Sequence, residues 1–365
     1  MLIIAASSLL SACAPGEDKK DQDAGNLKIY FINVGKGDAA LIGTPDHKWI
    51  MVDVGHADEF AHVGRILKQN SVTELEAVFI SHQHNDHFGA LGDVLSHVSC
   101  KVIYTTPFFE RFKHAGRFSD MAEQAGVPVE FLHPGDTLDI SGLRIDILGP
   151  NGAFAEEDDN SLVKMLTWDG QKVLFTGDQR YAAENELLKA GFSVQSDVLK
   201  AGNHGRNASS EDFLRAVGAK HCVITNDFKG KEYDESVSHF ASYGMQVYVL
   251  GHTGTMLCEI GGGTVNFYAV KSTLDQAVPD IVFEDLSASG AFAAIKNNSL
   301  KEVSLKGWSF MSAKDKTHFF FPDSSSIKPG QTLKVSDDMF GKIKKKDSLV
   351  LYDQYGRAVD SIATK

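Results

Sequence analysis

The chain has 365 residues, of which 43% are hydrophobic and 23% are charged. A chain of this length and hydrophobic content can bury substantial cores, so we expect two folded domains rather than one. Its 48 acidic residues outnumber its 36 basic residues, and the resulting net charge of −12 excludes a protein that binds nucleic acid through overall positive charge.

A short apolar run near the start of the sequence ends in a cysteine. Residues 2–13 are too few to span a membrane, and they resemble the apolar region and cysteine of a bacterial lipoprotein signal. We therefore expect residues 1–13 to be a lipoprotein signal segment and residues 14–26 to be a polar tether. This predicts an exported protein that a lipidated Cys13 anchors to a membrane, at the cell surface or in the periplasm. The alternative is an ordinary apolar terminus.

The following part of the chain alternates between strand-like and helix-like segments. Its first half predicts strands at 27–32, 39–42, 49–54, 77–80 and 101–105, with helices at 57–69 and 88–97. Its second half predicts a hairpin-like set of strands at 142–148, 161–168 and 172–176, then helices at 182–190 and 209–217 and strands at 221–225, 246–250 and 256–260. This order predicts two layered sheets with helices outside, an αββα sandwich.

Four potential metal ligands stand within six positions directly after the apolar segment 77–80, in the run His82-Gln83-His84-Asn85-Asp86-His87. Metal ligation needs imidazole and carboxylate groups that converge on a point. Alternating His82 and His84 at a strand end can face one ion, while Asp86 and His87 turn toward a second. The spacing therefore suggests a site for two ions, against the alternative of a polar loop rich in histidine.

This H-x-H-x-D-H pattern resembles the signature of the metallo-β-lactamase fold, and two further segments resemble motifs of that superfamily in order. Residues 50–55 resemble the first motif, a strand that ends in Asp53. Residues 172–178 resemble the fourth motif, in which Asp178 would bridge two metals. The resemblance therefore implies that carboxylates from separate strands join the histidine run.

The remaining two motifs of that superfamily are matched less evenly. Residues 197–205 resemble the fifth motif, which supplies His204. The histidine of the third motif is missing, and the segment in its place, residues 158–163, offers Asp159 or Asn160 instead. One metal position would therefore be short of an imidazole.

One subgroup is resembled more closely, the hydrolase domain of bacterial DNA-internalisation competence proteins. Residues 29–42 resemble its D-V-G-Q-G-D-A type opening, with Asn33 and Lys36 as substitutions. Another departure is Asn203, where that subgroup usually has the first histidine of a pair. The resemblance covers residues 27–269.

The resemblance implies two ligand sets. The first set is His82, His84 and Asp178, with Asn160 or Asp159 as a weak fourth ligand. The second set is Asp86, His87, Asp178 and His204. These donors suit Zn²⁺ or Mn²⁺, as one ion or two.

A metal-bound water could attack a phosphoryl or carbonyl centre. The catalytic candidates are Asp86, Lys200 and His252, the last two as cations that stabilise developing charge. Their alternatives are a solvent-facing lysine and a turn histidine. We expect Asp53 to orient a ligand histidine through its free ring nitrogen.

The sequence pattern changes at residues 271–280, which we expect to be a linker, and residues 281–365 consist of short strand-like segments. This region resembles a lamin-tail domain, an Ig-like β-sandwich, with Trp308 in its core. It has 13 basic and 10 acidic residues (+3), against 23 and 38 (−15) in the rest of the chain. Its lysines at 342 and 344–346 could contact an anionic cell-surface polymer, or they form a solvated loop.

The sequence thus predicts an αββα metallo-β-lactamase sandwich over residues 27–270, followed by a smaller all-β, lamin-tail-like domain. We expect an exported metal-dependent hydrolase, a phosphodiesterase or nuclease, with DNA as the leading substrate by resemblance. One alternative is a hydrolase of a cell-envelope ester or phosphodiester. Another is a non-catalytic surface binding lipoprotein whose site has decayed, which the missing third-motif histidine and Asn203 would allow.

Overall fold

The computed structural model describes residues 25–111, 113–206, 209–228, 230–270, 280–287, 292–312, 318–322, 324–336, 347–353 and 358–363. The predicted signal segment with Cys13 and most of the predicted tether and linker lie outside these residues, as does the lysine run. None of the helices in the described ranges combines the length and the apolar composition that a bilayer crossing requires.

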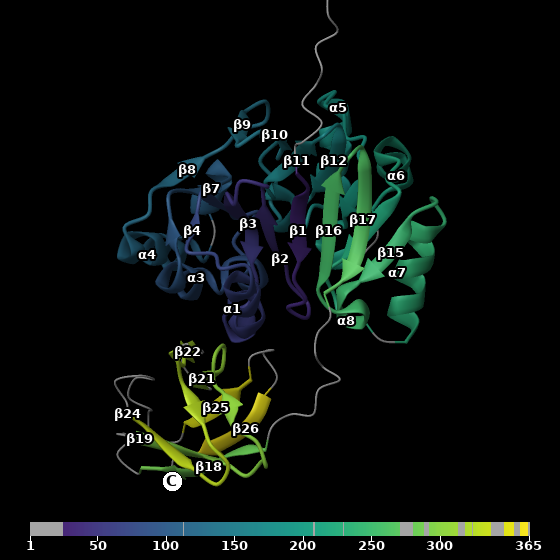
Figure 1. Ribbon diagram of the computed structural model, residues 1–365. Coiled ribbons are helices and arrows are strands. Elements are labelled where there is room, and N and C mark those ends of the chain that lie inside the picture. The colour runs from purple at the N-terminus through teal and green to yellow at the C-terminus, as the bar shows by residue number, and fades with distance from the viewer. Residues whose placement is uncertain are drawn as a thin grey trace, which may run out of the picture.

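The larger part of the chain contains two extended sheets (Figure 1). The first has eight strands in the order β17-β16-β1-β2-β3-β5-β7-β8. In chain order these strands are β1 (Leu27–Phe31), β2 (Ala39–Gly43), β3 (Trp49–Val54), β5 (Ala77–Phe79), β7 (Ile103–Thr105), β8 (Val129–Phe131), β16 (Met256–Gly261) and β17 (Thr264–Ala269). β3 and β5 are parallel neighbours, so the loops that follow them meet at one edge of the sheet.

The second sheet has seven strands in the order β15-β14-β13-β12-β11-β10-β9. In chain order they are β9 (Thr137–Ile140), β10 (Leu143–Gly149), β11 (Val163–Trp168), β12 (Gln171–Phe175), β13 (Val198–Lys200), β14 (His221–Ile224) and β15 (Gln246–Val249). β12 and β13 are parallel neighbours, so their following loops also meet at one edge.

Helices and short connecting elements complete this part of the chain. Beside the first sheet lie η1 (Ala57–Glu59), α1 (Phe60–Gln69), α2 (Asn85–Phe88), α3 (Leu91–His97), η2 (Pro107–Arg111) and α4 (Ala115–Ala125), with a small sheet of β4 (Glu74–Leu75) and β6 (Ser99–Cys100). Beside the second lie η3 (Asp158–Asn160), α5 (Tyr181–Lys189), η4 (Gly202–Gly205), α6 (Glu211–Val217), α7 (Lys231–Ala241) and α8 (Leu250–Thr253).

Three hydrophobic clusters hold these layers together. The first lies between the sheets, where the rings of Phe31 and Phe175 stack with centroids 5.7 Å apart. The second, which contains Phe60, joins the first sheet to its helices, and the third, which contains Phe213, joins the second sheet to its helices. Three buried seams require four layers, so the predicted αββα sandwich is confirmed.

Two of the longer helices, α4 and α7, are absent from the sequence prediction. In α4 only Phe118 and Ala122 are buried, and in α7 only Ser236 and Phe240 are buried. Each helix therefore buries only a narrow face and exposes most of its residues.

The C-terminal region is all β in its described part. Its strands are β18 (Ile281–Leu286), β19 (Phe292–Asn297), β20 (Val303–Ser304), β21 (Ser309–Ser312), β22 (His318–Phe320), β23 (Ser326–Ile327), β24 (Thr332–Ser336), β25 (Ser348–Tyr352) and β26 (Ala358–Ala363). They form sheets in the orders β18-β19-β24, β22-β21-β25-β26 and β20-β23. Trp308 is 1% exposed inside a cluster with Ile295 and Leu351, so it fills the core as expected.

The C-terminal domain contacts the first domain through Phe320 of β22, on the side where α1 lies (Figure 1). The ring of Phe320 stands edge-on to Phe60 and His97, at centroid distances of 5.6 and 4.8 Å. A Cβ added at Gly64 of α1 would lie 2.9 Å from the tip of this ring. The glycine therefore leaves the space into which Phe320 packs.

Candidate metal centre

The predicted ligands come together because four strands end close to one another. Asp53 lies in β3, the histidine run follows β5, Asp178 follows β12, and His204 lies in η4 after β13. Asp53 and His204 adopt left-handed backbone conformations, with φ of 53° and 51°. Non-glycine residues adopt such conformations rarely, and they cluster at functional sites where the surrounding structure holds them.

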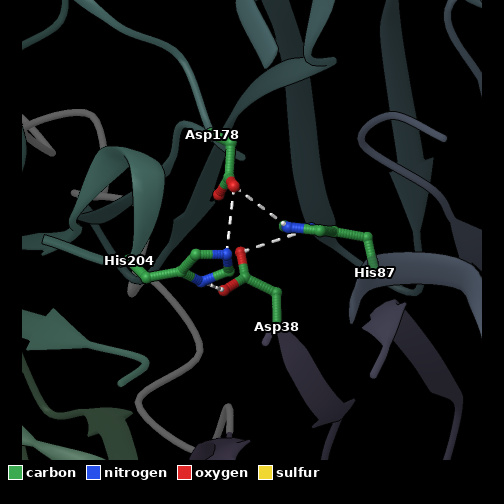
Figure 2. Close-up of side chains that lie close together, drawn as sticks. All are labelled: Asp38, His87, Asp178 and His204. Atoms are coloured by element: carbon green, nitrogen blue, oxygen red, sulfur yellow. Dashed lines mark ion pairs between the residues drawn. The ribbon is translucent and has the colours of Figure 1, made fainter. Parts of the chain in front are cut away.

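His87, Asp178 and His204 form the centre of the cluster (Figure 2). Asp178 Oδ2 lies 3.4 Å from His87 Nε2 and 3.0 Å from His204 Nε2. All three side chains are almost fully buried. Yet His87 Nε2, His204 Nε2 and Asp178 Oδ1 have no hydrogen-bond partner in the described structure. Buried polar atoms that lack hydrogen bonds are costly, and the convergence of these charged groups fits a divalent metal ion.

Each central histidine is oriented by a buried carboxylate at its other ring nitrogen. Asp53 Oδ2 lies 2.9 Å from His87 Nδ1, as expected for an orienting residue. Asp38 Oδ1 lies 3.2 Å from His204 Nδ1. Metal-bound histidines commonly donate their second N–H to a carboxylate, which leaves Nε2 for the ion.

Asp38 belongs to the cluster by distance, but its oxygens are already engaged. The Thr225 hydroxyl donates to Asp38 Oδ1 at 2.6 Å, and the Lys200 ammonium contacts Asp38 Oδ2. Asp38 is therefore an orienting residue rather than a ligand.

Lys200 is in the cluster, but in a different role from the predicted one. Its side chain is 2% exposed, and its ammonium also donates to the Gly177 carbonyl at 3.0 Å. A cation held there neutralises Asp38 from the protein interior and does not face a substrate. The prediction that Lys200 stabilises charge developing on the substrate is therefore wrong.

A second group of potential ligands adjoins the first, formed by His82, His84 and Asp158. Asp158 Oδ1 lies 2.9 Å from His84 Nδ1 and 3.7 Å from His82 Nε2, and the two imidazole nitrogens His82 Nε2 and His84 Nδ1 are 3.0 Å apart. Asp158, from the segment in which the third-motif histidine is missing, thus joins His82 and His84.

The two side chains that the sequence offered for this place have other partners. The amide of Asn160 accepts from Phe154 N and donates to the carbonyls of Phe154 and Glu156. Asp159 Oδ1 accepts from Arg180 N at 2.9 Å. The predicted ligand role of Asn160 is therefore wrong. In η3 successive side chains point in different directions, which the sequence pattern does not resolve.

Asp86 lies beside the central group and is 7% exposed. Its Oδ2 is 3.3 Å from His204 Nε2 and 2.7 Å from Lys36 Nζ. His252 is not brought to the cluster: its Nε2 lies 2.6 Å from the Phe228 carbonyl oxygen, and its ring packs on Tyr233. The predicted catalytic role of His252 is therefore wrong, since its ring has a local structural use.

Three hydroxyls complete the site. The sequence analysis did not identify them, because serine and threonine occur here with no distinctive spacing. Thr225 Oγ1 donates to Asp38 Oδ1 and lies 3.1 Å from His204 Nδ1. Ser81 Oγ lies 3.1 Å from both His82 Nδ1 and His87 Nδ1 and donates to Asp53 Oδ2 at 2.7 Å. Ser161 Oγ accepts from Asp178 N at 3.0 Å. These contacts couple the two ligand groups through the residues that hold them.

The electrostatics of the cluster favour a bound cation. Burial lowers the pKa of His204, but the charge of Asp178 raises it to about 9. Burial also lowers the pKa of His87, yet Asp178 and Asp38 raise it well above its usual value. Burial raises the pKa of Asp178, whereas the two histidines hold it well below its ordinary value. Burial lowers the pKa of His82, which keeps that imidazole neutral and able to ligate.

Known proteins resemble part of this chain. The curated relatives include ComE operon protein 3 of Bacillus subtilis, 24% identical over 217 residues that cover 54% of this chain and 28% of the relative. Ribonuclease J of Sinorhizobium meliloti is 27% identical over 154 residues, which cover 40% of this chain and 26% of the relative. This chain therefore spans about a quarter of the length of these relatives.

Among solved structures, the metallo-beta-lactamase fold protein YhfI from Bacillus subtilis is similar with a TM-score of 0.44 and 16% identity, covering 61% of this chain and 96% of that one. A diphosphatase from the PhnP family is similar with a TM-score of 0.40 and 13% identity, covering 65% of this chain and 99% of that one.

Two family models match separate parts of the sequence. The lamin tail domain model matches residues 275–365, in agreement with the β-rich C-terminal region. The metallo-beta-lactamase superfamily model matches residues 32–221 and thus covers the strands and loops that build the metal centre. Because that match covers more than half of the chain, this protein belongs to the metallo-β-lactamase superfamily.

Proposed function

We propose that this protein is a metal-dependent phosphodiesterase that acts on nucleic acid. The convergence of buried His87, Asp178 and His204, with ligand atoms that lack hydrogen-bond partners in the described structure, carries this proposal. Imidazole and carboxylate donors suit Zn²⁺ or Mn²⁺. The adjoining group at His82 offers a place for a second ion.

A divalent ion held by these donors would lower the pKa of a bound water to about 7 and so supply a nucleophile at neutral pH. Asp53 and Asp38 fix the ring orientations of the central histidines. Lys36 is 40% exposed with its ammonium on Asp86, so it can meet negative charge on a substrate that reaches the cluster. We therefore assign to Lys36 the cationic role predicted for Lys200 and His252, which is to stabilise charge that develops on the substrate.

The name of one relative supports a phosphodiester substrate, because Ribonuclease J is a ribonuclease by name. The other relative is named for the ComE operon, and its name states no substrate. A cell-envelope ester or phosphodiester remains the alternative substrate. A binding lipoprotein with a decayed site is less favoured, because Asp158 replaces the missing histidine with another donor.

The test compares metal content and hydrolysis in the full chain and in Asp178→Ala. After chelation and reloading with Zn²⁺ or Mn²⁺, the full chain should hydrolyse bis(p-nitrophenyl) phosphate and linear DNA, but not p-nitrophenyl acetate. Asp178→Ala should lose most metal and activity, whereas Asp146→Ala, a substitution in β10, should change neither. Full turnover and full metal content in Asp178→Ala would reject the site.

We also propose that the protein is exported and anchored through Cys13, on the sequence pattern alone. Cys13→Ser should then move the protein from the membrane fraction to the soluble fraction, because lipidation there would be the anchor. Unchanged membrane fractionation of Cys13→Ser would refute the anchor.

A further inference from the structure

Arg117 of α4 is fixed on the histidine run by neutral partners. Its Nη1 donates to Asn85 Oδ1 at 2.7 Å, its Nη2 donates to the Gly89 carbonyl at 3.3 Å, and its guanidinium lies 5.4 Å from the Phe88 ring centroid. The side chain is exposed, and among the described residues no carboxylate pairs with it. Its position is therefore set while its charge stays uncompensated.

A second arginine, Arg206, lies directly after η4, the element that carries His204. It follows His204 by two residues, is exposed, and lies 5.8 Å from the Phe228 ring centroid. Glu232 and Glu235 line the same hollow of about 640 Å³, but Glu235 pairs with Lys231 at 3.0 Å. Within the described ranges, no carboxylate forms an ion pair with Arg206.

Three other arginines of this acidic domain are paired with carboxylates. Arg144 pairs with Asp146, Arg215 pairs with Glu211, and Arg180 contacts three acidic side chains. Arg117 and Arg206 differ from these three, because no carboxylate pairs with either guanidinium group within the described part of the chain.

The histidine run that Arg117 contacts and the loop that carries Arg206 meet at the cluster, where Asp86 Oδ2 is 3.3 Å from His204 Nε2. Lys36 sits on Asp86 at the same junction. Guanidinium groups bind phosphate through paired N–H donors, and phosphate contacts position a nucleic acid without reading its bases.

We propose that Arg117 and Arg206 bind phosphates that flank the scissile one, so that the substrate is a polymeric phosphodiester chain rather than a single phosphodiester. This inference rests on the proposed function and names the substrate class of the same site. The domain is negatively charged as a whole, but a polyanionic substrate would meet the local positive charge of Arg117 and Arg206 beside the segments that carry the ligands.

The test uses the full, metal-loaded chain and a series of oligothymidylates from the dinucleotide to the dodecamer. In the unmodified protein KM should fall with length until the flanking phosphates are filled. Arg117→Gln and Arg206→Gln should each raise KM for the dodecamer roughly threefold to tenfold and lower the slope of log KM against log salt by about 0.7. Arg117→Lys and Arg206→Lys, which keep the charge, should recover part of the loss.

The matched control is Arg144→Gln, which removes the same charge from an exposed strand and should leave the length dependence unchanged. Metal content and melting temperature are measured for every variant, so that an unfolded protein is recognised. A KM that does not depend on length, or that responds equally to Arg144→Gln, overturns this inference. Failure of the unmodified protein to hydrolyse even bis(p-nitrophenyl) phosphate would instead reject the proposed function.

Discussion

At the scale of single residues, the metal centre depends on buried charges that are not ligands. Asp38 and Lys200 form an ion pair inside the protein, and Asp38 in turn orients His204. Removal of one partner of a buried pair leaves the other charge uncompensated, which costs about 3–5 kcal/mol. The pair therefore affects both the stability of the fold and the geometry of the ligand.

We predict that Lys200→Met weakens metal binding by about tenfold to a hundredfold, the range seen for residues that orient metal ligands. The double variant Asp38→Asn with Lys200→Met should regain folding stability relative to Lys200→Met, because it removes the unpaired buried charge, but it should not regain metal affinity, because the carboxylate that orients His204 is lost. Competition with a chromophoric chelator measures the affinities, and Lys189→Met, on the exposed end of α5, is the control. Identical affinities for Lys200→Met and the unmodified chain would show that the pair has no positioning role.

Lys164 is a second buried cation, and it provides a pH-dependent test of stability. Burial lowers the pKa of Lys164 to about 8, although Asp53 and Asp38 raise it; its ammonium donates to the Leu162 carbonyl. Because the folded pKa lies below the unfolded value, the charged form destabilises the fold fully below pH 8. This penalty shrinks as pH rises from about 8 to 10.5.

Lys164→Met should therefore raise the free energy of unfolding at pH 7 by up to about 3 kcal/mol, and by less at pH 10. Chemical denaturation at both pH values measures the difference, with Lys189→Met as the exposed control. A gain that is the same at both pH values would mean that packing, and not the charge of Lys164, is responsible.

At the scale of elements, the sequence predicted strands better than it predicted the placing of side chains in turns. The strands before Asp53, His82 and Asp178 have strong apolar patterns, so their ends could be located from the sequence. The turn at η3 has three polar residues in a row, and only its backbone geometry selects Asp158 over Asp159 and Asn160. The role of Asp38 also could not be predicted from the sequence, because it depends on contacts with Lys200 of β13 and with Thr225, which follows β14.

Gly64 in the interior of α1 gives a test at this scale. A glycine costs about 1 kcal/mol relative to alanine inside a helix, so Gly64→Ala should stabilise the protein unless the new Cβ meets Phe320. We predict no gain, or a loss, in the full chain, and a gain of about 1 kcal/mol when Phe320→Ala is also present. Thermal and chemical denaturation of the unmodified chain, Gly64→Ala, Phe320→Ala and the double variant measure this coupling. An equal change in the free energy of unfolding in both backgrounds would show that Phe320 does not require a glycine at position 64.

At the scale of the whole molecule, the two domains differ in fold and charge and yet share a packed contact. Phe320 joins the hydrophobic cluster between the first sheet and its helices, beside Phe60. The residues of both ligand groups, in contrast, all belong to the first domain. The contact thus links the stability of the domains, while the described metal ligands do not depend on the C-terminal domain.

We therefore predict that a chain ending at Val270 keeps its metal content and its turnover of bis(p-nitrophenyl) phosphate. It should lose about 1.5–3 kcal/mol of stability, the value of burying one large apolar side chain, and Phe320→Ala in the full chain should lose a similar amount. Metal analysis, turnover and denaturation of the truncated chain, Phe320→Ala and the unmodified protein give the comparison. A truncated chain that is folded and metal-loaded but inert on the small substrate would show that the β-domain completes the active site. The metal centre would then depend on the C-terminal domain for turnover, and the contact through Phe320 would affect activity as well as stability.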